Sequence, residues 1–212
     1  MTITLYGYTG SGSAAAECGL ALAGLNYRNV QAASWDTHSA IDELRRVNPL
    51  AQIPTLQWDD GSVMTESAAI LIELGLRHPA SGLLPADPAA RANAIRGLVY
   101  IAANCYAMIG VIDYPDRVMA QPDKQEAERV VRRSRERLHE LWSQFADQIP
   151  ATPFLGGAAP NALDILAAVV SKWAGARQHL AQARPQWAAV LPRIEGHPAL
   201  APVFQRHWPA KR

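Results

Sequence analysis

Cysteine is scarce in this chain, and neither sign of charge dominates it. Only two cysteines occur among 212 residues, and Cys18 and Cys105 match neither a disulfide framework nor a metal-binding spacing, so we expect reduced thiols. Twenty Lys and Arg nearly balance nineteen Asp and Glu, which leaves no basic field to hold nucleic acid or an anionic membrane. The six histidines are scattered without a ligand spacing. We therefore expect no metal site, no nucleic-acid partner and no membrane partner.

Long apolar runs are also missing. The best candidate for a membrane span, residues 97–112, has sixteen residues without charge, whereas a spanning helix needs roughly 20. The first residues show neither a basic start nor the apolar stretch of a signal peptide. What is present is a composition that is 49% hydrophobic and 18% charged, enough for a buried core. These features predict a cytoplasmic globular protein.

A linker rich in proline divides the chain. Residues 79–88 contain three prolines and a glycine, which interrupt any helix there. Before the linker, strand patterns at 3–7, 27–30, 55–58 and 62–64 alternate with helical patterns at 14–25, 39–47 and 67–78. Ser13 and Ser67 are the expected helix caps. The order βαβαββα predicts two parallel strands joined by a helix, followed by an antiparallel hairpin at Asp60-Gly61.

The second half, 89–212, shows only helical patterns. Long helices are expected at 89–112 and 123–149, a short one between Pro185 and Pro192, and a last one at 197–208. Asn161 opens a further helix, and Asp164 three residues later completes the pattern of a capping box. An α/β domain at 1–78 followed by an all-helical bundle at 89–212 is the expected architecture.

The loop between the first strand and the first helix is made of small residues, Gly10-Ser11-Gly12-Ser13-Ala14-Ala15. Small side chains let a ligand approach the backbone and the helix N-terminus. The same letters fit the dinucleotide fingerprint G-x-G-x-x-A, with Asp36 in the place of a ribose-binding acid. The dinucleotide-binding fold needs more parallel strands than the single βαβ unit expected here. The other interpretation of this loop is a flexible turn into the helix, without a ligand.

The segment from Asn48 to Leu56, Asn-Pro-Leu-Ala-Gln-Ile-Pro-Thr-Leu, ends one helix and starts a strand. Pro54 at a strand start is either a trans proline on an edge or a cis proline. A cis bond would turn the N–H and C=O of Ile53 outward, where an extended peptide pairs with them as an added strand does. The segment by itself leaves both alternatives open.

Thr65-Glu66-Ser67 closes the hairpin and opens the next helix. A free α-amino acid group fits this place, with its carboxylate at the helix N-terminus and its ammonium at Glu66. A capping turn without any ligand would have the same sequence.

Together these segments resemble one family. A strand, a small-residue loop and a helix, then Asn-Pro-x-x-x-Ile-Pro-Thr-Leu, then Glu-Ser and a helix are similar to the thioredoxin-like N-terminal domain of soluble, bacterial-type glutathione S-transferases. The helical half is similar to that family's C-terminal domain. The resemblance implies glutathione as co-substrate, with Ile53 pairing through its backbone with the cysteinyl part beside Pro54. It implies that Glu66 and Ser67 hold the γ-glutamyl end, and that Gln52 lies near the glycyl carboxylate, where many members have Lys.

The resemblance also implies a detoxifying transferase that activates the thiol of glutathione. Family members use Tyr, Ser or Cys in the loop after the first strand, and here Ser11 and Ser13 are the candidates, with Thr9 less favoured and Tyr6 expected to pack. The thiolate then attacks a hydrophobic electrophile held between the domains. The expected walls of that second site are Tyr8, Tyr106, Met108, Tyr114 and Trp173.

Two alternatives stay open beside the transferase. One is a non-catalytic module of the same fold, used for protein interaction or ligand carriage. The other is a glutathione-dependent reductase, peroxidase or isomerase. A homodimer is expected from the family. The loop contains no cysteine, which argues against a mixed-disulfide mechanism, and Cys18 is expected to be a buried structural thiol.

Overall fold

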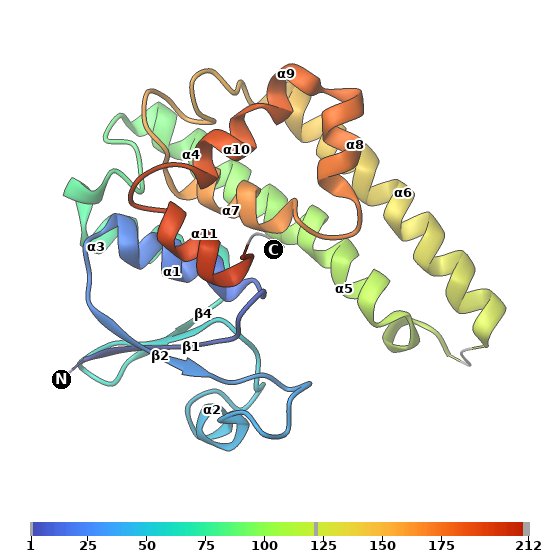
Figure 1. The fold of residues 1–212 in the computed structure, drawn as a ribbon, viewed down its shortest axis with the longest axis horizontal. Helices are drawn as coiled ribbons and strands as arrows, with labels where there is room; N and C mark the ends of the chain where they lie inside the picture. The colour runs from blue at the N-terminus through green and yellow to red at the C-terminus, as the bar shows by residue number, and fades with distance from the viewer. Residues whose placement is uncertain (1, 121–122, 210–212) are drawn as a thin grey trace.

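The computed structural model describes residues 2–120 and 123–209, and it joins a small sheet to a larger set of helices (Figure 1). Residues 1, 121–122 and 210–212, which fall within the two expected domains, lie outside the described residues. The sheet has four strands in the order β2-β1-β3-β4. Strands β1 (Ile3–Gly7) and β2 (Tyr27–Gln31) run parallel, whereas β3 (Thr55–Gln57) and β4 (Val63–Thr65) form an antiparallel hairpin beside β1. The predicted topology is confirmed.

Helices cover both faces of the sheet. Helix α2 (Ile41–Val47) lies alone on one face, and α1 (Ser13–Leu22) and α3 (Ser67–Arg77) lie on the other (Figure 1). Adjacent residues of a strand point to opposite faces. Accordingly Leu5 packs into the core shared with α1 and α3, and Tyr6 packs with Ile41 and Leu44 of α2. The face with α1 and α3 in turn packs against the helical region through α7 (Ala162–Val170).

The ends of helices α1, α2 and α3 differ from the prediction, and α2 starts two residues late, at Ile41. Helix α1 stops at Leu22, three residues early, because the chain turns into a left-handed conformation at Gly24. Ser13 and Ser67 are the first residues inside their helices, after N-caps at Gly12 and Glu66, and neither makes a capping hydrogen bond. The hydroxyl groups of Ser13 and Ser67 therefore do not cap these helices. Each one bonds elsewhere in the protein or is available to a ligand.

The helical region begins with a short 3₁₀ turn, η1 (Pro79–Ser81), and α4 (Pro88–Tyr100) starts at the end of the expected linker. Helix α6 (Lys124–Gln148) agrees with the predicted helix within one residue at each end, whereas the last helix, α11 (Ala201–His207), starts four residues later than predicted. The short helix expected between Pro185 and Pro192 is present but ends before Pro192, and a second helix follows it. Two short helices occupy this segment, α9 (Pro185–Ala188) and α10 (Val190–Glu195), which contains Pro192, and α8 (Ala176–Ala183) precedes them. Pro192 lies in the first turn of α10, where a backbone N–H has no helical partner to lose.

Helix α4 continues through a π-helical turn, η2 (Ile101–Tyr106), into α5 (Ala107–Asp113). The continuous helix Pro88–Asp113 has 26 residues, more than the charge-free run alone predicted, and by length and composition it is able to cross a membrane. Helices of water-soluble cores pass the same test. Here α4 packs on α7, and α5 packs on the long helix α6.

The predicted capping box at the start of α7 is confirmed. The Asn161 side chain accepts from Leu163 N at 2.8 Å, and Asp164 Oδ2 accepts from Asn161 N at 3.1 Å. Asp164 Oδ1 accepts a further bond from Leu155 N at 2.8 Å. Burial raises the pKa of the Asp164 carboxyl to about 6, against the effect of these backbone donors. The box thus anchors α7, all of whose residues are buried.

Candidate functional site

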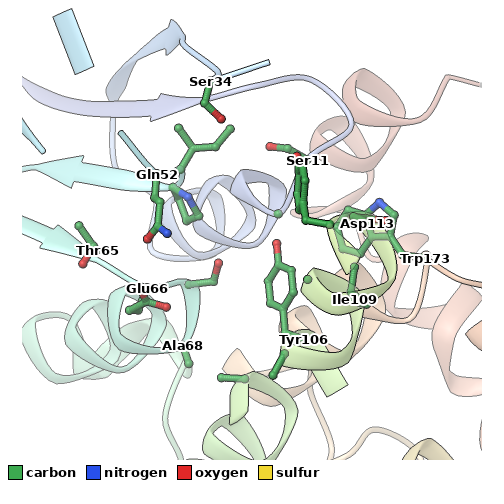
Figure 2. A pocket seen from close by; sticks show the side chains of 18 of the residues that line it. Ser11, Ser34, Gln52, Thr65, Glu66, Ala68, Tyr106, Ile109, Asp113 and Trp173 are labelled. Carbon is green, nitrogen blue, oxygen red and sulfur yellow. The ribbon is translucent and has the colours of Figure 1, made fainter. Parts of the chain in front are cut away.

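A cavity of about 580 Å³ lies where the sheet meets the helical region. Its walls come from the loop after β1, the segment before β3, the turn between β4 and α3, and the helices η2 and α5 (Figure 2). The loop after β2 and the α7–α8 connection complete it. The three segments singled out in the sequence therefore converge on one space.

The loop after β1 contains the two candidate hydroxyls. Ser13 is fully buried; its Oγ accepts from Tyr8 N at 3.1 Å and lies 3.2 Å from Tyr8 O. Ser11 Oγ accepts from Ser13 N at 3.2 Å, donates to Tyr8 O at 2.7 Å, and is 2.9 Å from Ser13 Oγ. Of the two, Ser11 lines the cavity and Ser13 does not. Ser13 holds the shape of the loop, and Ser11 presents its side chain to a ligand.

The last helix supports this loop. Gly10 N donates to His207 Nδ1 at 3.1 Å, and His207 Nε2 lies 2.8 Å from Glu17 Oε1. Because Nδ1 is the acceptor, Nε2 carries the proton and donates it to Glu17. Burial by itself would raise the pKa of Glu17, but the hydrogen bonds from His207 and Arg206 outweigh it and lower that pKa to about 2. A charged Glu17 therefore fixes His207, and His207 fixes the loop.

The segment before β3 is shaped by Asn48. Its amide donates to Gln52 O at 3.2 Å and to Thr55 Oγ1 at 3.0 Å, and its Oδ1 accepts from Leu50 N at 3.1 Å. The Ile53–Pro54 peptide bond is cis, which decides between the two alternatives for this proline. Gln52, Ile53 and Pro54 all line the cavity. Within residues 2–120 and 123–209, neither the N–H nor the C=O of Ile53 has a hydrogen-bond partner.

The turn between β4 and α3 faces the same space. Glu66 has φ +64°, a conformation that is costly for a residue with a side chain and that concentrates at functional sites. Glu66 and Ser67 both line the cavity, and Figure 2 shows Glu66 across it from Ser11. In the part of the chain that the structure describes, the Ser67 hydroxyl has no protein partner. An acidic group, a hydroxyl and the N-terminus of α3 thus lie together at one end.

Three of the five predicted apolar walls line the cavity: Tyr106, Tyr114 and Trp173. The rings of Tyr106 and Trp173 are stacked with centroids 6.0 Å apart. Met108 does not take part, because residues two positions apart on a helix point to different sides, and it packs against the core. Tyr8 does not line the cavity either, since its hydroxyl donates to Asp36 Oδ2 at 2.9 Å.

Several lining residues escaped the sequence analysis. Trp35 in the loop after β2 is 56% exposed and meets Tyr8 edge to face at 5.7 Å. Asp113 ends α5, and burial raises the pKa of its carboxyl. Arg117 lies with its guanidinium 3.8 Å from the centre of the Tyr114 ring. The sequence offered one sign of these residues, a tryptophan in the loop after β2. The others could not be found from local patterns, because their position at the cavity depends on how the loops pack.

Other candidates lie away from the cavity. Thr9 bonds Gln31 Oε1 through its N–H at 3.0 Å, and Tyr6 is buried in the α2 core as expected. Burial raises the pKa of both cysteine thiols, that of Cys105 to about 12, so they stay protonated. With one parallel strand pair in the sheet, and Asp36 outside the cavity, the dinucleotide alternative is wrong. Among the described ranges 2–120 and 123–209 no three His, Cys, Asp or Glu side chains come together as a metal site requires.

Known proteins are similar to this chain in sequence and in fold. Residues 16–76 match the family described as the glutathione S-transferase N-terminal domain. The uncharacterized GST-like protein YncG of Escherichia coli K12 is 29% identical over 206 residues, which cover 97% of this chain and 98% of that protein. BphK, a bacterial GST solved as a ternary complex, is 27% identical with a TM-score of 0.78, covering 95% of this chain and 98% of BphK.

A glutathione transferase homologue from Sulfitobacter, solved with bound glutathione, has the same fold. Its TM-score is 0.84 at 21% identity, covering 95% of this chain and 96% of that one. The cavity described above lies within this shared thioredoxin-like sheet and helical region. The match to the N-terminal domain family, the GST-like relative and the GST structures together support the soluble, bacterial-like glutathione S-transferase superfamily for this chain, which has serines in the loop that follows the first strand.

Proposed function

We propose that this chain is a glutathione transferase: it binds glutathione in the cavity and directs the thiolate at a hydrophobic electrophile. One observation carries the proposal. The unpaired backbone of Ile53 and the Glu66–Ser67 turn face the same cavity, as an extended γ-glutamyl peptide requires. In this proposal, domain 1–78 holds glutathione and domain 89–212 supplies most of the wall for the second substrate.

Each part of glutathione meets a matching group. The cysteinyl backbone pairs with the N–H and C=O of Ile53, as a neighbouring strand would. The γ-glutamyl carboxylate accepts from the Ser67 hydroxyl and from the free N–H groups at the start of α3, and its ammonium pairs with Glu66. Gln52 offers the glycyl carboxylate a neutral amide, a weaker partner than a lysine.

The loop after β1 then stabilises the sulfur as an anion. A glutathione thiol is mostly protonated at neutral pH, and the thiolate is the nucleophile. Ser11 Oγ and Ser13 Oγ both donate to Tyr8 O, at 2.7 Å and 3.2 Å. In this proposal the Ser11 hydroxyl turns from Tyr8 O to the bound sulfur, and Ser13 keeps its bond to that carbonyl. A hydrogen bond to the charged form lowers the thiol pKa, and the thiol proton leaves to solvent. The thiolate pair forms the new C–S bond, and the leaving group departs with the electron pair of the broken bond.

The remaining wall suits an apolar electrophile. Tyr114, Trp173 and Ile109 face the cavity from the helical region, and aromatic side chains supply a large contact area without charge. The Arg117 guanidinium on the Tyr114 ring stands at this edge. A hydrophobic electrophile, whose electron-poor carbon bears the leaving group, therefore fits this side of the cavity.

Glutathione binding and turnover test the proposal. Calorimetry should show glutathione binding at millimolar or lower concentration, and chlorinated nitroaromatic acceptors should give a measurable rate. Ser11→Ala should lower the rate about tenfold and raise the thiol pKa by about one unit, because a charge-assisted hydrogen bond is lost. Ser34→Ala is the matched control, since Ser34 lines the same cavity from the loop after β2.

The outcomes separate the alternatives. No binding at millimolar glutathione would reject the assignment. Binding without turnover on a panel of electrophiles would favour the non-catalytic module. Equal rates for Ser11→Ala and the native chain would show that another group activates the thiol.

We further propose that the chain is a cytoplasmic homodimer. Leu76 on α3 and Val99 on α4 are 57% and 54% exposed on two adjoining helices, and a second chain that covers them would remove this apolar surface from water. Two buried free cysteines fit a reducing compartment. Sedimentation equilibrium should give twice the chain mass of 23.0 kDa, and cell fractionation should place the protein in the soluble fraction. A mass of one chain at micromolar concentration would contradict the dimer.

A further inference from the structure

The hydroxyl of Tyr106 reaches the loop after β1 from the helical region. Tyr106 ends the π-helical turn η2, and Figure 2 shows its ring standing in the cavity, with Glu66 to one side and Trp173 to the other. A Cβ atom added to Gly12 would overlap Tyr106 Oη and come 3.0 Å from Cζ. The phenol thus fills the place where a side chain of residue 12 would begin.

Gly12 is required here for space. Its φ of −63° and ψ of −13° are ordinary helical values that any residue adopts. The backbone therefore does not call for glycine, whereas the approach of Tyr106 does. The absence of a side chain at this position lets a group from the second region reach the start of α1.

Two unused donors meet at that point. Neither the Tyr106 hydroxyl nor the Gly12 N–H has a hydrogen-bond partner among residues 2–120 and 123–209. Burial, and then the carboxylates of Glu66 and Asp113, raise the pKa of Tyr106 to about 12, so the phenol keeps its proton at neutral pH. Tyr106 is half-buried and lines the cavity, so an anionic ligand atom there can accept from its hydroxyl without displacing a protein partner. Ser11, the other hydroxyl at this end, lines the same cavity.

We propose that Tyr106 is a catalytic residue whose hydroxyl donates a hydrogen bond to the glutathione thiolate, opposite Ser11 and beside the Gly12 N–H. The inference rests on the proposed function, and it assigns to the helical region a part in thiol activation that the loop alone was expected to perform. Tyr106 keeps its proton throughout, and the thiol proton still leaves to solvent. The stacking of its ring on Trp173 holds the hydroxyl in place.

Tyr106→Phe removes the hydroxyl and keeps the ring. We expect the pKa of bound glutathione, followed by ultraviolet thiolate absorbance, to rise by about one unit, and turnover at neutral pH to fall about tenfold. The KM for glutathione and the unfolding temperature should change little, because the ring contacts remain. The limb of the pH–rate profile that reports thiolate formation should shift upward by the same unit. Tyr6→Phe removes a phenol that bonds Glu43 outside the cavity, and it should leave the thiol pKa, the turnover and the KM unchanged.

Gly12→Ala gives an independent test with Tyr106 intact. The new Cβ displaces the hydroxyl, so the thiol pKa should rise as it does in Tyr106→Phe. The turnover of the double variant should be within about twofold of that of either single variant, since each substitution removes the same interaction.

If the thiol pKa and the rate of Tyr106→Phe equal those of the native chain, the inference is overturned. The proposed function would not be affected, because glutathione binding and the effect of Ser11→Ala do not depend on Tyr106. Additive losses in the double variant would also overturn the inference, because they would show two separate effects. Failure of the native chain to bind glutathione is a different result, seen without any variant, and rejects the proposed function together with the inference.

Discussion

An Asp164→Ala variant is expected to lose about 3 kcal/mol of unfolding free energy. Asp164 is fully buried, and its two oxygens accept from the backbone N–H groups of Leu155 and Asn161. Alanine leaves both donors buried without an acceptor, and each costs about 1–3 kcal/mol. Helix α7, which this residue anchors, lies between α1, α3 and α4, so the loss affects the whole core. Urea or thermal unfolding measures the change.

Two further variants make this test specific. Asp123→Ala removes an N-cap that accepts from Glu126 N on the exposed start of α6, and should cost about 1 kcal/mol. Asp164→Asn keeps an acceptor oxygen and should cost less than alanine. If Asp164→Ala costs no more than Asp123→Ala, the buried capping box does not anchor α7.

The same residue predicts a pH dependence. Its pKa of about 6 in the folded state lies above the value of about 3.9 in an unfolded chain, so folding favours the protonated carboxyl. Its contribution to stability is therefore complete below about pH 4 and falls as the pH rises through 6. Asp164→Asn does not titrate and should lack that fall. Unfolding curves of both chains between pH 4 and 7 provide the comparison.

Replacing Glu66 with alanine should weaken glutathione binding by about 10- to 100-fold. The expected loss corresponds to one charge-assisted hydrogen bond to the γ-glutamyl ammonium. Glu66→Gln, which keeps the shape and removes the charge, should lose about tenfold. Calorimetric titration with glutathione measures both constants.

The fold should survive these changes, because Glu66 is exposed and makes no side-chain hydrogen bond to cap α3. Glu73→Ala is the matched control on the same helix; its carboxylate pairs with Arg77 on the surface and is not part of the cavity wall. An affinity for glutathione that is unchanged in Glu66→Ala would show that the ammonium lies elsewhere.

Much of the architecture followed from local patterns. The Asp-Gly turn, the alternation of residues in β1, and the Asn161–Asp164 box each depend on neighbours within a few positions. The motifs around Ile53 and Glu66 by themselves left ligand-free alternatives open, and their resemblance to one family implied glutathione; the structure shows unpaired backbone at Ile53 and a helix N-terminus at Ser67.

The parts that local patterns did not predict are the ones that depend on distant contacts. Ser11 and Ser13 differ by two positions, and only the packing of the loop shows that Ser13 is buried while Ser11 faces the cavity. The sequence by itself determined the fold, through local patterns and the family resemblance of its motifs, and it also identified the two ends of the proposed glutathione site. Only the tertiary structure brought Tyr106 onto Gly12, because the angle between a helical region and a sheet is decided by long-range packing that no local pattern contains.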